Sequence, residues 1–195
     1  MLYAPRDGRL SPDRAAGPAE IDPGDWLGGA FAFVIGTRCN PDTPPFVPGL
    51  GMGAEDFSHL LAARFPGFSP PAAWRVLQQK PIETKGPLQE FDDLLQLFFE
   101  HMAADDRKNR EVAHLLASAC MGSDHLWQDL GLPSRSALSE LMSQYFPGLA
   151  EKNRADMKWK KFFYRALCER EGIRICKSPS CASCLDHQNC FGPEQ

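Results

Sequence analysis

Apolar residues recur along much of this chain at the spacing of one face of an α-helix. Phe57, Leu60, Leu61 and Phe65 stand at positions i, i+3, i+4 and i+8, which places them on one helical stripe. Further helices are expected over residues 26–37, 88–102, 112–120, 124–130, 138–146 and 159–167. No segment alternates apolar and polar residues convincingly, as a half-buried strand does. The pattern predicts an all-α fold, a single helical domain of about six to seven helices.

Residues that start or stop helices flank several of these segments. Asp124 is expected to cap a short helix through Leu130 that ends at Gly131, because Asp caps helix N-termini and Gly follows C-termini. Ser134 is expected to cap the next helix, and Pro147 to break it.

Composition divides the chain into three regions. Residues 1–23 are rich in Pro, Gly, Ala and Asp and are expected to form a flexible leader. Residues 24–172 hold the helical segments, and 43% hydrophobic content in 195 residues is enough for one core. Residues 173–195 contain a run of cysteines and are expected to form an irregular tail after the last helix.

The net charge of -4 gives no general reason to expect binding to nucleic acid or to an anionic membrane. The longest apolar stretch, Ala30 to Ile35, is too short to span a bilayer, and no apolar signal core follows Met1. The chain has seven cysteines, an odd number, and four of them are crowded at one end, unlike a secreted disulfide framework. We therefore expect a cytoplasmic protein without nucleic-acid or membrane partners.

The cysteines of the tail carry the clearest chemical signal. Cys176, Cys181, Cys184 and Cys190 have the spacing C-x4-C-x2-C-x5-C. Thiolates are soft ligands that suit zinc, copper(I) and iron–sulfur clusters. Structural zinc sites usually pair two C-x2-C units across a longer spacer, and this run has only one such unit. The spacing favours an iron–sulfur cluster and leaves zinc open.

Two other tail residues are candidates for cofactor binding. His187 lies between Cys184 and Cys190, so it is either a metal ligand or an exposed loop histidine. Lys177 lies inside the loop, where a cation would offset the charge of an anionic cluster or attract an oxyanion such as molybdate. The basic residues between Lys158 and Arg174 could contribute to the same field, although a solvated helix face explains most of them.

The remaining sequence suggests a carrier more than a classical enzyme. No Ser-His-Asp or Cys-His catalytic arrangement is recognisable. Cys120 lies on an apolar helix face and is expected to be a buried core thiol. Cys168 falls off the main apolar stripe of the last helix, where a structural thiol is the simpler interpretation. Cys39 lies in a proline-rich loop and has no assigned role.

Several segments of the chain, together with the complete cysteine run, resemble the NifQ family of nitrogen-fixation proteins. The matching segments are Phe33–Arg38, Arg110–Leu116, Asp124–Leu132, Met157–Phe162 and Cys190–Pro193. The likeness covers most of the chain after about residue 25, and the cysteine spacing is its most specific element.

The resemblance implies an iron–sulfur molybdoprotein of iron–molybdenum cofactor biosynthesis. It implies that molybdenum from molybdate or another source is built into a Mo–Fe–S cluster of three-iron or four-iron type. The expected recipients are the NifEN scaffold and the nitrogenase iron protein. Cys176, Cys181, Cys184 and Cys190 would then be the cluster ligands. The alternatives are a ferredoxin-like electron carrier and a structural zinc-binding interaction module.

Overall fold

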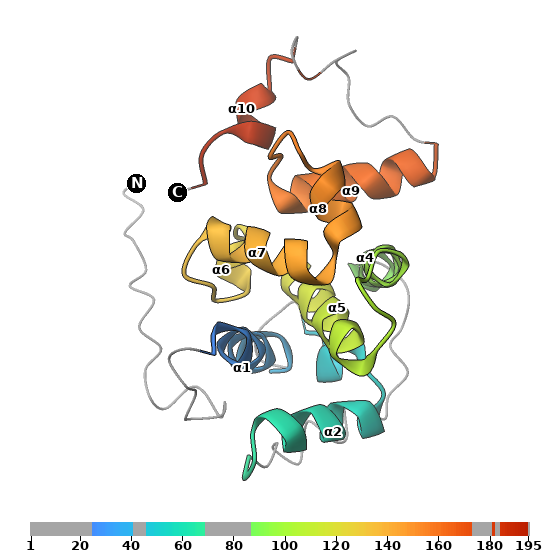
Figure 1. Cartoon of the computed structure of the whole chain (residues 1–195), viewed down its shortest axis with the longest axis vertical. Helices are drawn as coiled ribbons and strands as arrows, with labels where there is room; N and C mark the ends of the chain where they lie inside the picture. Colours follow the sequence, from blue (N-terminus) through green and yellow to red (C-terminus); the bar gives the residue numbers. More distant parts are fainter. Residues whose placement is uncertain (1–24, 41–45, 69–86, 173–180, 182–183, 195) are drawn as a thin grey trace.

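The computed structural model describes residues 25–40, 46–68, 87–172, 181 and 184–194, with the side chains of residues 87–89 left aside. The described residues form helices and contain no strand (Figure 1). The predicted all-α fold is therefore confirmed. The expected leader, residues 1–23, lies outside the described residues, as do Cys176 and Lys177.

The longer helices match the segments expected from the hydrophobic pattern. They are α1 (Trp26–Arg38), α2 (Ala54–Arg64), α4 (Pro87–Glu100), α5 (Arg107–Cys120), α7 (Arg135–Tyr145) and α9 (Trp159–Arg170). Shorter elements join them: η1 (Pro48–Gly51), α6 (Leu126–Asp129), α8 (Pro147–Lys152) and α10 (His187–Phe191). None of the described helices combines the length and the apolar character needed to cross a bilayer.

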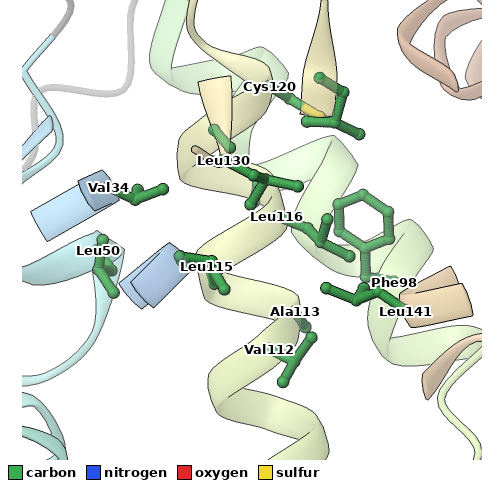
Figure 2. Packing of buried hydrophobic residues seen from close by; sticks show 14 of the residues in the cluster. Val34, Leu50, Phe98, Val112, Ala113, Leu115, Leu116, Cys120, Leu130 and Leu141 are labelled. Carbon is green, nitrogen blue, oxygen red and sulfur yellow. The ribbon is translucent and has the colours of Figure 1, made fainter. Parts of the chain in front are cut away.

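Helix α5 lies at the centre of the helical body and contacts α1, α4, α6 and η1. Its side chains Leu115 and Leu116 are fully buried. Figure 2 shows side chains from the neighbouring elements around them, among them Val34 of α1, Phe98 of α4 and Leu141 of α7. Each such buried side chain contributes about 1.5–3 kcal/mol relative to an exposed one. The fully buried residues of this core lie in the helical body, and residues of the cysteine tail only pack against it partly buried.

Helix α4 buries a somewhat different face from the one expected. Its deepest residues are Phe91, Leu94 and Phe98, whereas Leu95 and Phe99 are only partly buried against the core. The sequence predicts a stripe of apolar residues that includes Leu95 and Phe99 and leaves out Leu94; its members are Leu88, Phe91, Leu95, Phe98, Phe99 and Met102. Because apolar residues cover more than half of this helix's circumference, spacing alone does not fix its rotation.

The helix ends show which capping residues predict correctly where a helix begins or ends. Ser134 caps α7 as expected, since its hydroxyl oxygen accepts a hydrogen bond from the Ala137 amide at 3.2 Å. The expectation for Asp124 was wrong: α6 begins at Leu126, and His125 occupies the cap position. Gly131 ends α6 with φ +67°, and a Cβ there would lie 2.7 Å from the Phe33 ring. Position 131 therefore needs glycine for both reasons.

Pro147 ends one helix and begins another. Helix α7 stops at Tyr145, and Pro147 is then the first residue of α8. Proline has no amide hydrogen, so it is tolerated at the first helical position. The sequence pattern predicts only the break and does not reveal the six-residue helix α8.

Candidate metal centre in the C-terminal tail

The described part of the tail is a series of turns that leads into α10. The Cys184 amide donates to the Cys181 carbonyl at 3.2 Å, and the His187 amide donates to the Cys184 carbonyl at 3.2 Å. Cys181, Cys184, His187 and Cys190 consequently follow one another at three-residue intervals through consecutive turns and a short helix. The tail had been expected to be an irregular loop, and α10 was not predicted, because five residues show no apolar periodicity.

The tail packs against the body close to the start of α9. The Lys158 amide donates to the Cys190 carbonyl at 2.8 Å. Cys181, Cys190 and Phe191 lie partly buried against the core, while no residue of α10 is buried. In Figure 1, α10 lies next to the α8–α9 end of the body and far from α2. The described cysteines of the tail are thus held at one end of the molecule.

Arg165 of α9 contacts one of the candidate ligands directly. Its Nη1 atom donates to Cys181 Sγ at 3.4 Å, while its Nε donates to Glu169 Oε1 at 2.7 Å. The Glu169 hydrogen bond raises the pKa of the Arg165 guanidinium, and Cys181 adds to the rise. Glu169, one helical turn further on, orients the guanidinium toward the tail. A cation that donates N–H to sulfur stabilises a thiolate.

The three described tail cysteines are chemically available. Cys181, Cys184 and Cys190 are free thiols of intermediate exposure. Their soft donor atoms suit a transition-metal cluster. Among the described residues, no three His, Cys, Asp or Glu side chains are gathered as the ligand set of a metal ion. The donor set fits the chemistry, and the complete ligand set, which includes Cys176, stays a prediction.

The ring of His187 stacks on a neighbouring aromatic side chain. The centroids of His187 and Phe191 are 4.5 Å apart, with 19° between the ring planes. His187 is otherwise exposed. This contact places the ring on α10, between Cys184 and Cys190, and leaves its predicted part in metal binding open.

A buried ion cluster, which the sequence did not reveal, joins three distant segments. Asp129, with a side chain only 5% exposed, accepts from Arg38 Nη2 at 2.9 Å and also pairs with Lys160. Lys160 Nζ donates to the Gly122 carbonyl at 2.9 Å as well. A side chain at position 122 would collide with Asp129 and Arg38. Lys160, one of the basic residues before the tail, is therefore committed to the body.

The other basic residues of this region differ in their surroundings. Arg170 pairs with Asp93, Glu100 and Glu171. Lys158 and Lys161 have no ion pair with any residue in the described ranges. The remaining cations of this stretch, Arg174 and Lys177, lie outside the described residues.

Two cysteines of the body are buried and have strongly perturbed acidity. Burial raises the pKa of the Cys120 thiol to about 12, with nearby Lys160 opposing the rise. Burial also raises the pKa of the Cys39 thiol to about 12, although the Leu50 and Gly49 backbone groups lower it. Both are neutral thiols at physiological pH and poor metal ligands. Cys120 is thus the core thiol that was predicted.

A second set of contacts, also missed by sequence analysis, attaches the end of the tail. Arg135 pairs through Nη1 with Glu194 Oε1, and through Nη2 with Asp156 Oδ1 at 2.7 Å. The same Nη2 donates to the carbonyls of Asp156 and Met157, each at 3.1 Å. Arg135 and Glu194 are 59 positions apart, and no local spacing indicates such a pair. We call this set of contacts the Arg135 clamp.

Comparison with known proteins gives a consistent result. A family model described as NifQ matches residues 30–192. Protein NifQ of Azotobacter vinelandii is 39% identical over 152 residues, which cover 74% of this chain and 78% of that protein. Protein NifQ of Rhodobacter capsulatus is 36% identical over 181 residues, covering 92% and 96%.

A third relative, Protein NifQ of Klebsiella pneumoniae, is 48% identical over 138 residues, covering 62% of this chain and 83% of that protein. No solved structure matches the chain. The matched region contains the described body from residue 30 onward, together with all four cysteines of the tail.

Proposed function

Because this chain belongs to the NifQ family, which implies a role in iron–molybdenum cofactor biosynthesis, we propose that it is a molybdenum-processing and donor protein. Its cargo is a Mo–Fe–S cluster. In this role the helical body serves as a scaffold, and the C-terminal tail carries the cargo. The observation that carries the proposal is the set of free, partly exposed cysteines in one tail segment of a chain with this family membership.

Cys176, Cys181, Cys184 and Cys190 are the proposed cluster ligands. Three of the thiolates hold a three-iron core, and molybdenum occupies the remaining corner. The fourth cysteine, His187 or an exogenous ligand caps that corner. A donor needs one exchangeable position, because transfer requires a bond that opens readily. An exposed residue such as His187 suits a position that must exchange.

Cations near the cysteines serve two purposes in this proposal. Arg165 donates to Cys181 Sγ at 3.4 Å, and hydrogen bonds to ligand sulfur tune the properties of a cluster. Lys158 and Lys161, which carry no ion pair within the described part of the chain, and Lys177 would draw in an oxyanion such as molybdate. Lys160 has no part in this field, because Asp129 and Gly122 hold its ammonium group.

The experiment that tests the proposal is purification without oxygen, followed by measurement of iron, sulfide and molybdenum per chain. We expect iron and sulfide in cluster stoichiometry, with molybdenum bound in addition. A preparation with zinc as its only stoichiometric metal would end the proposal and favour a structural zinc module. A four-iron cluster with a reversible one-electron couple and no uptake of molybdenum would instead favour a ferredoxin-like electron carrier.

The NifEN scaffold and the nitrogenase iron protein are the proposed recipients. Transfer can be measured by mixing loaded protein with each recipient and separating the two. Molybdenum should move to the recipient from the wild type, whereas a variant without the tail cysteines should deliver none. The proposal of these recipients fails if loaded protein keeps its molybdenum in the presence of both.

A further inference from the structure

We propose that Arg135 is a positioning residue that fixes Cys190 against the helical body through the Arg135 clamp. The inference rests on the proposed function in one respect, namely that Cys190 is a cluster ligand. It adds the device that holds this ligand in place, which neither the cysteine spacing nor the family membership specifies.

The clamp joins the segment before α9 to the end of the tail. Arg135 is the first residue of α7, and one side of its guanidinium binds the Asp156 side chain and the Asp156 and Met157 carbonyls, just before α9. Its other side binds Glu194, beyond α10. One planar group with several N–H donors in a fixed geometry is suited to holding two segments at once.

The same two segments share a second connection next to the candidate ligand. The Lys158 amide, one residue after Met157, donates to the Cys190 carbonyl at 2.8 Å. The backbone of Cys190 is therefore attached directly by this hydrogen bond. The chain is attached again four residues later, by the Glu194 ion pair. Two adjacent attachments restrict the backbone of Cys190 far more than either attachment does alone.

Burial makes the Glu194 contact depend on Arg135. The Glu194 side chain is 4% exposed, and its Oε2 atom has no hydrogen-bond partner in the described part of the chain. His125 Nδ1 lies 3.8 Å from Glu194 Oε1, beyond hydrogen-bonding distance. A buried carboxylate without its cation is strongly disfavoured. Without Arg135, Glu194 gains by moving into water, and the end of the tail then separates from the body.

A fixed Cys190 has a clear use in cluster binding. A ligand that is held in position before the cargo arrives loses less conformational freedom on binding. No residue of α10 is buried, so the short helix itself provides little of this order. The order at Cys190 comes from the body, through the Lys158 hydrogen bond, the packing of Cys190 and Phe191 against the core, and the Arg135 clamp.

The test uses reduced, metal-free, full-length protein and two site-specific readouts. The first is the rate of Cys190 alkylation by N-ethylmaleimide, measured by peptide mass spectrometry. The second is hydrogen exchange at the Lys158 amide by NMR, because this amide donates to the Cys190 carbonyl. For Glu194→Ala we expect both rates to rise by roughly tenfold or more, with a smaller rise for Glu194→Gln, which keeps an acceptor.

Controls separate release of the tail from general unfolding. Arg154→Ala removes an exposed ion pair with Glu151 and should leave both rates unchanged. Cys120 is deeply buried, so its alkylation reports opening of the body. Arg135→Ala should raise the alkylation rate of Cys190 at least as much as Glu194→Ala does. If Arg135→Ala also raises the alkylation rate of Cys120, the body has opened, and the Glu194 variants alone decide the test.

The inference is overturned if Glu194→Ala leaves both the Cys190 alkylation rate and the Lys158 exchange rate at the wild-type level. It is overturned equally if Glu194→Ala raises the alkylation rate of Cys120 as much as that of Cys190. Neither readout requires bound metal. A failure of the clamp would therefore leave the cluster proposal intact, and a failure of the metal analysis would leave the labelling result interpretable.

Discussion

The helical body and the cysteine tail use the same residue type in opposite ways. In the body, Cys120 and Cys39 are buried, and burial raises the pKa of each thiol to about 12. In the tail, Cys181, Cys184 and Cys190 are partly exposed, and a guanidinium donates to Cys181. The first environment suppresses the thiolate, whereas the tail leaves its thiols accessible and supplies a cationic hydrogen-bond donor to one of them. Surroundings separate structural cysteines from candidate ligands.

The two regions also differ in what holds them together. The body is packed around α5, whereas no residue of α10 is fully buried. The described part of the tail is attached by the partial burial of Cys181, Cys190 and Phe191 and by a few polar contacts. Regions with few buried contacts change conformation at low free-energy cost. If the tail carries the cluster as proposed, fold stability and metal binding depend on different regions, and each should respond to mutation separately.

The largest expected effect is on metal content. Cys184→Ala should abolish cluster retention while far-ultraviolet circular dichroism stays close to that of the wild type, because the body has its own apolar core. Iron and sulfide analysis measures the first effect. Cys168→Ala is the matched control, since it removes a free thiol from α9 and should keep the metal. Wholesale loss of helix in Cys184→Ala would contradict the separation of fold stability from metal binding and would show that the metal is needed for folding.

The next effect belongs to the body alone. Asp129→Ala leaves Arg38 and Lys160 without their buried partner, and we expect a loss of about 3–5 kcal/mol in the free energy of unfolding. Urea denaturation at neutral pH measures it. Asp105→Ala, which removes an exposed ion pair with Arg110, should have a much smaller effect. Equal losses from the two substitutions would contradict the buried role of Asp129.

A smaller effect is expected in alkaline solution. The pKa of Cys120 is about 12 in the folded protein and 9.0 as the ordinary value, so the unfolded chain loses this proton first. The contribution of the protonated Cys120 thiol to the free energy of unfolding is fully present below about pH 9. It falls by about 1.4 kcal/mol per pH unit between the two pKa values. Urea midpoints at pH 8 and pH 10 should therefore diverge less in Cys120→Ala than in the wild type. An identical pH slope would show that Cys120 is not buried as a neutral thiol.

The smallest effect concerns the cation beside the tail. Arg165→Ala removes the N–H donor to Cys181 Sγ, which should lower the cluster reduction potential by roughly a few tens of millivolts. The sign follows because a cation stabilises the more negative, reduced cluster. Protein-film voltammetry measures the shift. Lys161→Ala removes the same charge from an exposed position on α9 and should shift the potential less. An equal shift would show that Arg165 acts only through its positive charge and not through its hydrogen bond to Cys181.

Local physics made the body largely predictable from sequence. The spacing of Phe57, Leu60 and Leu61 located α2, and all three are buried. Ser134 was found as a cap because its hydroxyl acts on an amide three residues away. Such signals operate within one or two turns of helix. The rotation of α4 could not be found in this way, because it depends on which neighbouring helices it meets.

The contacts around the candidate site could not be predicted for the same reason. Arg38 and Asp129 are 91 positions apart, and Arg135 and Glu194 are 59 apart. Each pair forms only after several helices have packed. The cysteine run indicated the chemistry, because ligand spacing is a local property. Which cation holds which part of the tail is decided by tertiary structure.

The most direct test of the central claim is anaerobic electron paramagnetic resonance of the purified protein, with and without added molybdenum, beside Cys184→Ala. The account predicts an iron–sulfur signal in the wild type that changes on molybdenum uptake and is absent from the variant. A wild-type protein that binds only zinc and gives no signal in either state would contradict it.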